Sequence, residues 1–351
     1  MKVDITITPE ILELIAGIDE FRGRWEALGA ISRDVLTELK KTATIESVGS
    51  STRIEGSRMT DHQVETLLAN IKIQKFTTRD EQEVAGYGKV MDTIFDSWEH
   101  LELNENHLLQ LHAILLSYSE KDQRHRGGYK TLDNHVAAFD RDGNQLGIVF
   151  ETSSPFETPK RTQELLAWMK QATDQKEYHA LLRIAVYVVR FLAIHPFQDG
   201  NGRLSRAITT LLLLQSGYEY VSYASIERII EDNKESYYRA LRTTQLSFQD
   251  ETIDWNAWIV YFLRTLKKQC DVLRTKVEQH KLMQVSKLST LAAKILTLYS
   301  HHQYLTNREI VALTDSNKNT VKYTLTQLVK EKLLIVEGKG RSTRYRLAGK
   351  Y

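Results

Sequence analysis

The sequence has little of what secreted and membrane proteins depend on. Its 351 residues include one cysteine, Cys270, so an internal disulfide framework is excluded, and we expect a reducing compartment with Cys270 as a small buried hydrophobe. No stretch approaches the ~18 apolar residues of a membrane-spanning helix. Acidic residues interrupt the N-terminal segment MKVDITITPEILELIAGIDE where a signal peptide would need its apolar core. We therefore predict a cytoplasmic protein without a membrane partner.

The overall charge is small but unevenly distributed. Hydrophobic residues make up 42% and charged residues 26% of the chain, as in an ordinary soluble protein, and the length allows two or three domains. The formal net charge of +2 conceals 13 Lys and Arg against 4 Asp and Glu in residues 281–351. One end of the protein is therefore basic, and this hints at the partners of that end.

The stretch that organises the rest of the chain is residues 195–206, which read HPFQDGNGRLSR. Two dense apolar runs, Leu181–Ile194 and Leu204–Leu214, flank it and predict two buried helices joined by a short polar loop. Pro196 disfavours helical geometry at His195, so the first helix should end there. The loop is where chemistry could sit.

The second half of this loop is suited to binding an anion. Gly200 and Gly202 permit backbone angles that expose consecutive N–H groups at the start of the second helix, where the helix dipole is positive. Arg203 and Arg206 are three residues apart and share a helix face, so both guanidinium groups can close on one polyanion. The pattern indicates a ligand rich in phosphate.

Two further side chains of the loop suggest catalysis. Asp199 is a hard oxygen ligand beside the proposed phosphate site, as expected for Mg²⁺ bridging nucleotide phosphates. His195, with an ordinary pKa of about 6.5, can accept a proton near neutral pH. The alternatives are a helix-turn-helix corner with a capping Asp and a solvated His, or a zinc site, for which the neighbouring sequence offers no further ligands.

The loop resembles the signature HxFx(D/E)GNGRxxR of the Fic/Doc family, with every fixed position present. The resemblance implies transfer of AMP from MgATP to a hydroxyl of a target protein. Carried onto this sequence, it implies His195 as the base, Asp199 as the Mg²⁺ ligand, and phosphate contacts from the second half of the loop: Gly200, Asn201, Gly202, Arg203 and Arg206.

A second motif lies about 140 residues earlier, in the sequence GSSTRIEGS. Ser51 and Glu55 are four apart and would share a helix face, and Gly56 is placed to end that helix. This resembles the inhibitory motif (S/T)xxxE(G/N) of many Fic proteins. The resemblance implies that Glu55 pairs with Arg206 and occupies the room of the γ-phosphate; a plain capped helix end is the alternative.

Residues 136–152 should form a hairpin within an otherwise helical chain. Strands are expected at Val136–Phe139 and Leu146–Phe150, around an Asp-Gly turn. A lone hairpin is not stable unless it docks on something. In the family such a hairpin, the flap, holds the target segment by main-chain pairing, a role that the resemblance assigns here to Val149, Phe150, Glu151 and Thr152.

Two other segments have less specific patterns. The resemblance suggests that Tyr237, Tyr238 and Gln245 contact the adenosine, although the family often has Asn at the last position and aromatics on a helix are more often core. The run from Trp255 to roughly Met283 should be a long helix that closes the core, and its apolar face could also serve as the contact of a homodimer.

The basic end has its own pattern. We expect helices at Leu291–Tyr299, at Asn307–Leu313 behind a Thr306–Glu309 capping box, and after the DSNKN turn, followed by strands at Leu334–Glu337 and Thr343–Leu347. This order resembles a winged helix-turn-helix domain. The residues then available for DNA are Lys318, Asn319, Lys322 and Tyr323 on the third helix and Lys339, Arg341 and Arg344 on the wing. A protein-interaction module or a merely solvated face is the alternative.

We thus predict a mainly α protein with a Fic-type helical core, a small β-hairpin flap and a C-terminal winged helix-turn-helix domain. Its expected parts are a helical region at 1–100 containing the motif at 51–56, a catalytic domain at 101–283, and the winged domain at 284–351. The leading function is an autoinhibited enzyme that uses Mg²⁺ and ATP to modify a partner protein or itself. The alternatives are a DNA-binding regulator that senses nucleotide or modifies only itself through this site, with residues 288–351 on DNA, and a Fic enzyme that removes AMP or transfers another phosphate-containing group.

Overall fold

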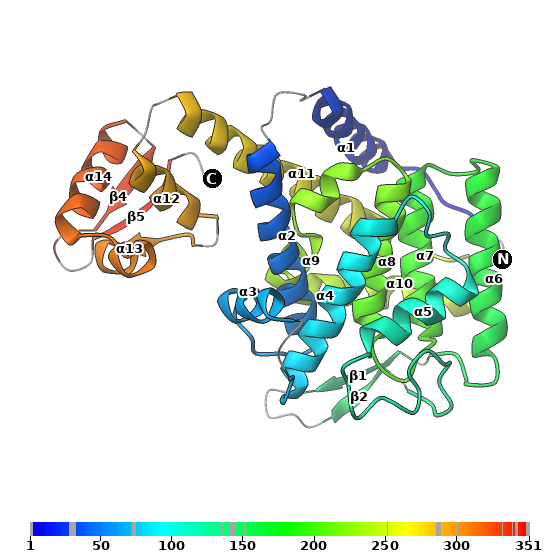
Figure 1. Cartoon of the computed structure of the whole chain (residues 1–351). Helices are drawn as coiled ribbons and strands as arrows, with labels where there is room; N and C mark the ends of the chain where they lie inside the picture. Colours follow the sequence, from blue (N-terminus) through cyan, green and yellow to red (C-terminus); the bar gives the residue numbers. More distant parts are fainter. Residues whose placement is uncertain are drawn as a thin grey trace. The chain divides into compact units, whose positions relative to one another are not determined.

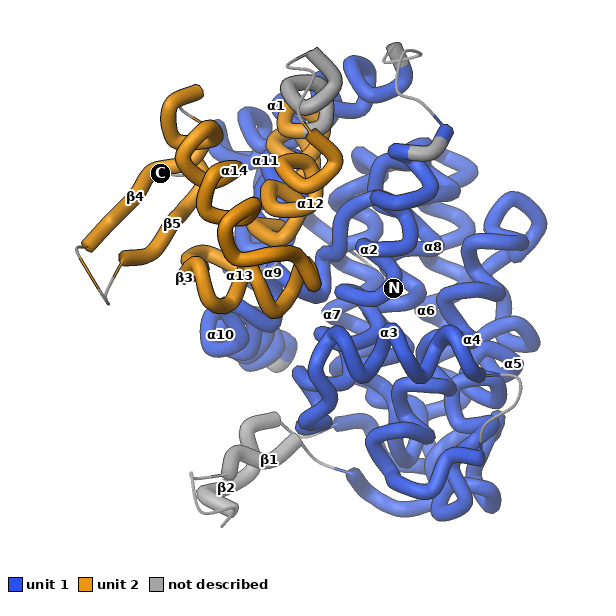
Figure 2. The backbone as a smooth tube through the Cα atoms, turned by 60° about the vertical axis from the view of Figure 1, so that its left-hand side comes forward, with its two compact units in different colours: residues 1–272 blue, residues 273–351 orange. Residues whose placement is uncertain are grey.

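Figure 1 shows the computed structural model of the chain. It describes residues 3–27, 33–71, 75–134, 136–139, 145–150, 152–250, 252–285, 289–300, 302–331, 333–338, 340 and 343–348. The chain divides into two compact units, residues 1–272 and 273–351, drawn blue and orange in Figure 2. Both are mainly helical, as predicted. Within the part of the chain that is described, no helix combines the length and apolarity needed to cross a bilayer.

The first unit is a helical assembly with one hairpin. Its α-helices are α1 (Pro9–Ala27), α2 (Arg33–Ile54), α3 (Asp61–Ala69), α4 (Arg79–Ser97), α5 (Glu105–Leu115), α6 (Thr158–Asp174), α7 (Ala180–Ile194), α8 (Asn201–Gln215), α9 (Ile226–Asp232) and α10 (Lys234–Leu246). Short 3₁₀ helices lie at η1 (Glu219–Tyr223) and η2 (Ser247–Gln249), and α11 (Asn256–Val285) runs across the division between the units. The N-terminal helices therefore belong to the same unit as the His195 loop.

The centre of this unit is the pair α7 and α8, which lie side by side in Figure 1. Thirteen of the fifteen residues in each helix are buried. Helices that are buried nearly all round need neighbouring elements on most of their faces. Here α6 packs on α7, while α4 and η1 pack on α8. The loop between two such constrained helices has little freedom to move.

Helix α2 carries the GSSTRIEGS motif onto this core. It packs against α4, α9 and η1 and touches α8. The helix ends at Ile54, and Gly56 follows with φ +108°, a left-handed conformation that favours glycine. The Ser57 N–H donates to the Thr52 carbonyl and the Gly56 N–H to the Arg53 carbonyl, both at 3.1 Å, which closes the end of the helix.

The predicted hairpin is confirmed as β1 (Val136–Phe139) and β2 (Gln145–Phe150), which pair antiparallel. Val136 pairs with Phe150 and Ala137 with Ile148, so Val149 is the extra residue of a β-bulge. Strand β2 lies beside α10, which provides the docking that an isolated hairpin needs.

The second unit has its own core. It contains α12 (Thr290–Leu298), α13 (Asn307–Thr314), α14 (Lys318–Lys330) and a three-stranded antiparallel sheet in the order β3 (Leu305–Thr306), β5 (Arg344–Leu347), β4 (Leu334–Glu337). The Thr306–Glu309 capping box is present. Apolar side chains from every element form the core, among them Ile295, Leu305, Ile310, Val321, Leu325, Leu334 and Leu347. The sequence did not predict β3, since two residues are too few to show a strand pattern.

Candidate active site

His195 stands outside helical geometry at the end of α7, as Pro196 predicted. Its φ of 53° and ψ of 60° are left-handed, and its N–H donates to the Phe191 carbonyl at 2.9 Å. Ring Nδ1 lies 3.3 Å from the Leu192 carbonyl, which can only accept, so Nδ1 carries the proton and Nε2 is the free base. Burial lowers the pKa of His195 to about 4. The imidazole is therefore neutral at pH 7 and able to accept a proton.

The side chain of Asn201 stabilises the loop through two hydrogen bonds to the Phe197 backbone. Its side-chain amide donates to the Phe197 carbonyl at 2.7 Å, and its Oδ1 accepts from the Phe197 N–H at 2.9 Å. Both groups are buried, so this reciprocal pair satisfies polar atoms that water cannot reach. The sequence suggested Asn201 as a phosphate ligand. Its side chain is already used within the loop, and what remains for a ligand is its backbone N–H.

Helix α8 begins at Asn201 with backbone N–H groups that have no carbonyl one turn earlier. Gly200 has φ +85°, a left-handed conformation that favours glycine, and a Cβ there would lie 2.9 Å from Leu115 Cδ2, so the Leu115 side chain would have to shift. A Cβ on Gly202 would lie 2.1 Å from Glu55 Oε1. A carboxylate therefore already rests against the first turn of α8, at the place predicted for an anion.

Asp199 offers one carboxylate oxygen for a metal. Oδ1 accepts from the Gly200 N–H at 2.5 Å and from Arg203 Nη2 at 3.1 Å. Oδ2 is 3.7 Å from Arg79 Nη2, beyond hydrogen-bonding distance. Partial burial would raise the pKa of Asp199, but Arg203 and the Gly200 N–H hold it below its ordinary value. The group is ionised at neutral pH, as a Mg²⁺ ligand must be.

Arg203 has donors that make no hydrogen bond within the described part of the chain. Its side chain is about 2% exposed, Nη2 donates to Asp199, and Nη1 lies 3.4 Å from Glu83 Oε2. Within the described residues, Nε and Nη1 of Arg203 have no hydrogen-bond partner. Buried donors without partners are costly, and a phosphate oxygen would satisfy them.

Arg206 is held by the residues that the sequence predicted as inhibitory. Its Nε donates to Ser51 Oγ and its Nη2 to the Ser51 carbonyl, both at 2.9 Å, and Nη2 also donates to Glu55 Oε1 at 2.8 Å. Burial would raise the pKa of Glu55, but the Arg206 charge overcomes this and lowers it. Glu55 remains 32% exposed. Segments 151 residues apart thus meet in one ion pair.

Arg53, inside the same motif, anchors the end of α2. Its guanidinium binds Glu231 through Nε at 2.6 Å, Asp61 through Nη2 at 2.9 Å, and the Met59 carbonyl through Nη1 at 2.8 Å. These contacts join the helix end to α9, to the first residue of α3 and to the turn before it. They fix the position from which Glu55 reaches Arg206, and the sequence analysis did not find them.

His112 of α5 is another site residue that the sequence analysis missed. Its ring stacks on Phe197 at 3.8 Å between centroids, Nδ1 accepts from the Gly127 N–H at 3.0 Å, and Nε2 lies 3.0 Å from the Asp199 carbonyl. Because Nδ1 accepts, Nε2 is the donor. Burial lowers the pKa of His112 to about 4, so this neutral tautomer persists at pH 7. His112 thus holds the loop through its contacts with Phe197 and the Asp199 carbonyl.

The structure describes three of the four residues predicted to dock a target segment. Val149 and Phe150 lie in β2, where the backbone is described, and Glu151 lies outside the described residues. Thr152 is buried and its Oγ1 accepts from Lys130 Nζ at 2.8 Å. Thr152 therefore faces inward rather than toward a partner.

The three residues suggested for adenosine differ in accessibility. Tyr237 and Gln245 are buried, whereas Tyr238 is 37% exposed. The rings of Tyr237 and Tyr238 pack edge to face, with centroids 5.1 Å apart. Burial raises the pKa of Tyr237, and the nearby Arg206 charge opposes this. Of the three, Tyr238 is the side chain that can meet a ligand without repacking.

The residues suggested for DNA lie in the second unit. Lys318, Asn319, Lys322 and Tyr323 are exposed on α14. Arg344 binds Glu337 at 3.2 Å and lies over the Tyr304 ring at 4.1 Å, while Lys339 and Arg341 lie outside the described residues.

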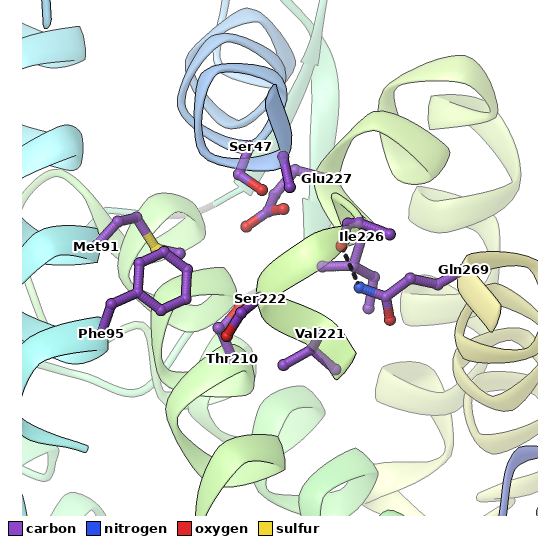
Figure 3. A pocket seen from close by; sticks show the side chains of 11 residues that line it. Ser47, Met91, Phe95, Thr210, Val221, Ser222, Ile226, Glu227 and Gln269 are labelled. Carbon is purple, nitrogen blue, oxygen red and sulfur yellow. Dashed lines mark hydrogen bonds between the residues drawn. The ribbon is translucent and has the colours of Figure 1, made fainter. Parts of the chain in front are cut away.

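A small hollow with several polar side chains lies between α2, α4, α8 and η1 (Figure 3). Tyr87 donates to Glu227 Oε1 at 2.9 Å and Gln269 Nε2 to the Ala224 carbonyl at 2.5 Å. None of the predicted site residues lines it. The hollow is therefore separate from the His195 loop.

Comparison with known sequences agrees with this geometry. Residues 102–213 match the Fic/DOC family, so the chain contains a domain of that family. The matched segment includes the hairpin and the whole of the loop from His195 to Arg206.

Individual relatives are distant. The chain is 26% identical over 239 residues to the protein adenylyltransferase Fic of Drosophila persimilis, covering 66% of this chain and 43% of that protein. A probable protein adenylyltransferase of Aquifex aeolicus is 24% identical over 112 residues, 32% of this chain and 34% of that protein. The chain thus spans less than half the length of these relatives.

Solved structures support the fold. A Fic family protein from Desulfovibrio desulfuricans matches with a TM-score of 0.63 at 23% identity, over 100% of this chain and 99% of that one. A Fic domain signalling protein from Bacteroides thetaiotaomicron matches with a TM-score of 0.61 at 22% identity, over 75% and 97% of the two chains. The first unit is therefore built on the Fic fold.

Proposed function

We propose that the protein is an autoinhibited protein adenylyltransferase that transfers AMP from MgATP to a Ser, Thr or Tyr hydroxyl of a target protein or of itself. One observation carries the proposal: a neutral imidazole with a free Nε2 and the first turn of α8 belong to one rigid loop, and two buried arginines stand on that helix. The family match and the names of the relatives support it.

The reaction follows from the loop. The target hydroxyl gives its proton to Nε2 of His195 as its oxygen attacks the α-phosphorus of ATP. The bond between that phosphorus and the oxygen leading to the β-phosphate breaks, and pyrophosphate leaves. The first N–H groups of α8 and the free donors of Arg203 would stabilise the charge on the transferred group.

Asp199 fits the role of metal ligand. The described residues contain no cluster of three or more His, Cys, Asp or Glu that could hold a metal by themselves. Mg²⁺ in nucleotide sites commonly takes one or two carboxylates and completes its shell with phosphate oxygens and water, so a single carboxylate with Oδ2 available is sufficient. When bound, the ion would neutralise charge on the phosphates.

Glu55 supplies the inhibition in this proposal. Its carboxylate takes one donor of Arg206 and lies against Gly202, so it competes with the γ-phosphate for both charge and space. ATP would then bind weakly, or with its α-phosphate away from His195. Ser51 holds the rest of the guanidinium in place and would keep Arg206 ready when Glu55 leaves.

The test is to incubate the purified protein and a cell lysate with Mg²⁺ and ATP labelled at the α-phosphate, and to locate the modification by mass spectrometry. Label from the α-phosphate and none from γ-labelled ATP distinguishes AMP transfer from phosphorylation. Failure of the Glu55→Gly variant to label any protein, including itself, would rule the proposal out.

DNA contact by the second unit is a second proposal, favoured by one observation. Lys318, Asn319 and Lys322 stand together at the exposed start of α14, the position of a recognition helix in a winged helix-turn-helix domain. Binding of a DNA duplex by the full-length protein, measured by gel shift at low salt, tests it. In that case the transferase would be a DNA-bound regulator.

A further inference from the structure

Lys130 is a buried lysine beside the loop, and neither motif assigns it a role. Its side chain is about 2% exposed, although lysine is seldom fully buried unless it is paired. Its ammonium donates to Asn134 Oδ1 at 2.8 Å, to Thr152 Oγ1 at 2.8 Å, and to the Ile194 carbonyl at 3.2 Å. Three donors thus meet three acceptors, all of them neutral.

The three acceptors come from segments that must act together. Asn134 precedes β1 and Thr152 follows β2, so they flank the open end of the hairpin. Ile194 ends α7, and its carbonyl is the last group before His195. The backbone N–H of Lys130 also donates to the Pro196 carbonyl at 2.9 Å. The side chain of Lys130 therefore ties both ends of the hairpin to the backbone just before the imidazole, and its backbone N–H binds the residue just after it.

Burying the Lys130 ammonium costs free energy, and this suggests that the residue has a functional role. A buried ammonium without an ionised partner is unfavourable, and a well-packed apolar residue would usually be tolerated better. Burial lowers the pKa of Lys130 to about 8, with the charge of Asp133 opposing, so the amine is still mainly protonated at pH 7. A neutral hydrogen-bonding side chain could have linked these segments, so the charge of Lys130 itself needs an explanation.

The charge also acts on His195. Burial is the main reason for its low pKa, and the nearby cation of Lys130 adds to it. The bond to the Leu192 carbonyl and the carboxylates of Glu55 and Asp199 act in the opposite direction. The charge of Lys130 thus opposes two neighbouring negative charges that favour protonation of His195.

We propose that Lys130 is a positioning residue for the transfer reaction: it sets the hairpin, on which the target segment would be held, at a fixed distance from the imidazole, and it places beside that imidazole a positive charge that disfavours its protonation. This inference rests on the proposed function. It applies to the target side of the reaction only, because the amine contacts neither α8 nor the arginines among the described residues.

The test compares Lys130→Met, Lys130→Gln and Lys130→Arg in full-length protein carrying Glu55→Gly. A displacement of about 1 Å can cost on the order of 100-fold in rate, so Lys130→Met should lower kcat/KM for the target by roughly 10- to 100-fold. MgATP affinity should stay within about twofold. The acid limb of the pH profile should move to higher pH in Lys130→Met and Lys130→Gln but stay in place in Lys130→Arg.

Unchanged kcat/KM and an unchanged acid limb in folded Lys130→Met would overturn the inference, as would equal losses of target transfer and MgATP affinity. Should Lys130→Met not fold, the Gln and Arg pair, which both keep hydrogen-bond donors, decides the charge effect. Titration of the His195 ring protons by NMR needs no activity. If no AMP transfer occurs at all, the proposed function fails, and an unmoved His195 pKa in Lys130→Gln would then reject the role of Lys130 as well.

Discussion

Glu55→Gly should convert the protein from a nearly silent into an active enzyme. In the structure Arg206 donates to three oxygens, two from Ser51 and one from Glu55. The substitution removes only the third contact and leaves the guanidinium anchored. It also clears the space against Gly202, where the carboxylate lies 2.1 Å from the position of a Cβ. Both the charge and the volume that oppose a γ-phosphate are then gone.

The size of the effect follows from the contact. A hydrogen bond between charged groups, here at 2.8 Å, is worth about 1.5–3 kcal/mol, which corresponds to roughly 10- to 100-fold in an equilibrium constant. Repulsion between the carboxylate and the phosphates adds to this, as does correct alignment of the α-phosphate. We expect self-modification and target labelling to rise by an order of magnitude or more.

The assay measures transfer from α-labelled ATP with Mg²⁺, with folding checked by circular dichroism. Glu55→Gln is a matched control that keeps the shape of the side chain but removes its charge, so it should be activated less than Glu55→Gly. Glu55→Gly combined with Arg206→Ala should lose the gain, because the freed arginine is what captures the γ-phosphate. Equal labelling by unmutated protein and Glu55→Gly at saturating MgATP would show that GSSTRIEGS is only a helix end.

In the Glu55→Gly background, His195→Ala should keep MgATP affinity and lose about 10²–10⁴ in transfer rate, and a rate equal to that of its parent would refute the base assignment. The pKa of about 4 for His195 predicts a kcat/KM that is flat from about pH 6 to 8 and falls only toward pH 4, because the neutral form persists; a limb near 6.5 would contradict this. Asn201→Ala leaves the buried N–H of Phe197 unpaired, while the Phe197 carbonyl keeps the Asn134 amide as a donor, and should lower the free energy of unfolding by about 1–3 kcal/mol, which thermal melting would detect. If the second unit binds DNA, Lys318→Gln and Lys322→Gln should each reduce the slope of log affinity against log salt by about one, and full-length protein that does not bind at low salt would end the idea.

The elements near the loop could be read from the sequence because each has a strong local cause. The apolar runs of α7 and α8 admit only buried helices, Pro196 ends the first, and the glycines open the second. Gly56 ends α2 for a similar local reason. The Asp-Gly turn between strand-forming residues predicted the hairpin to within one residue at one end.

What the sequence could not supply is which distant groups meet. The side chain of Asn201 bonds the backbone of Phe197 within the loop and does not face a ligand, and no spacing rule predicts this. His112 and Lys130 sit in segments with ordinary helix and turn patterns, and their roles exist only because tertiary packing brings them against the loop.

The sequence by itself determined which groups stand close together in this protein: an imidazole, a carboxylate, a helix start opened by glycines and two arginines within twelve residues. Neighbours along a chain are constrained by backbone geometry, so their relation is local and readable. The tertiary structure decided that Glu55 reaches Arg206 across 151 residues and that burial lowers the pKa of His195 to about 4. Desolvation and long-range ion pairing depend on what the whole fold places around a group, and no local pattern contains that information.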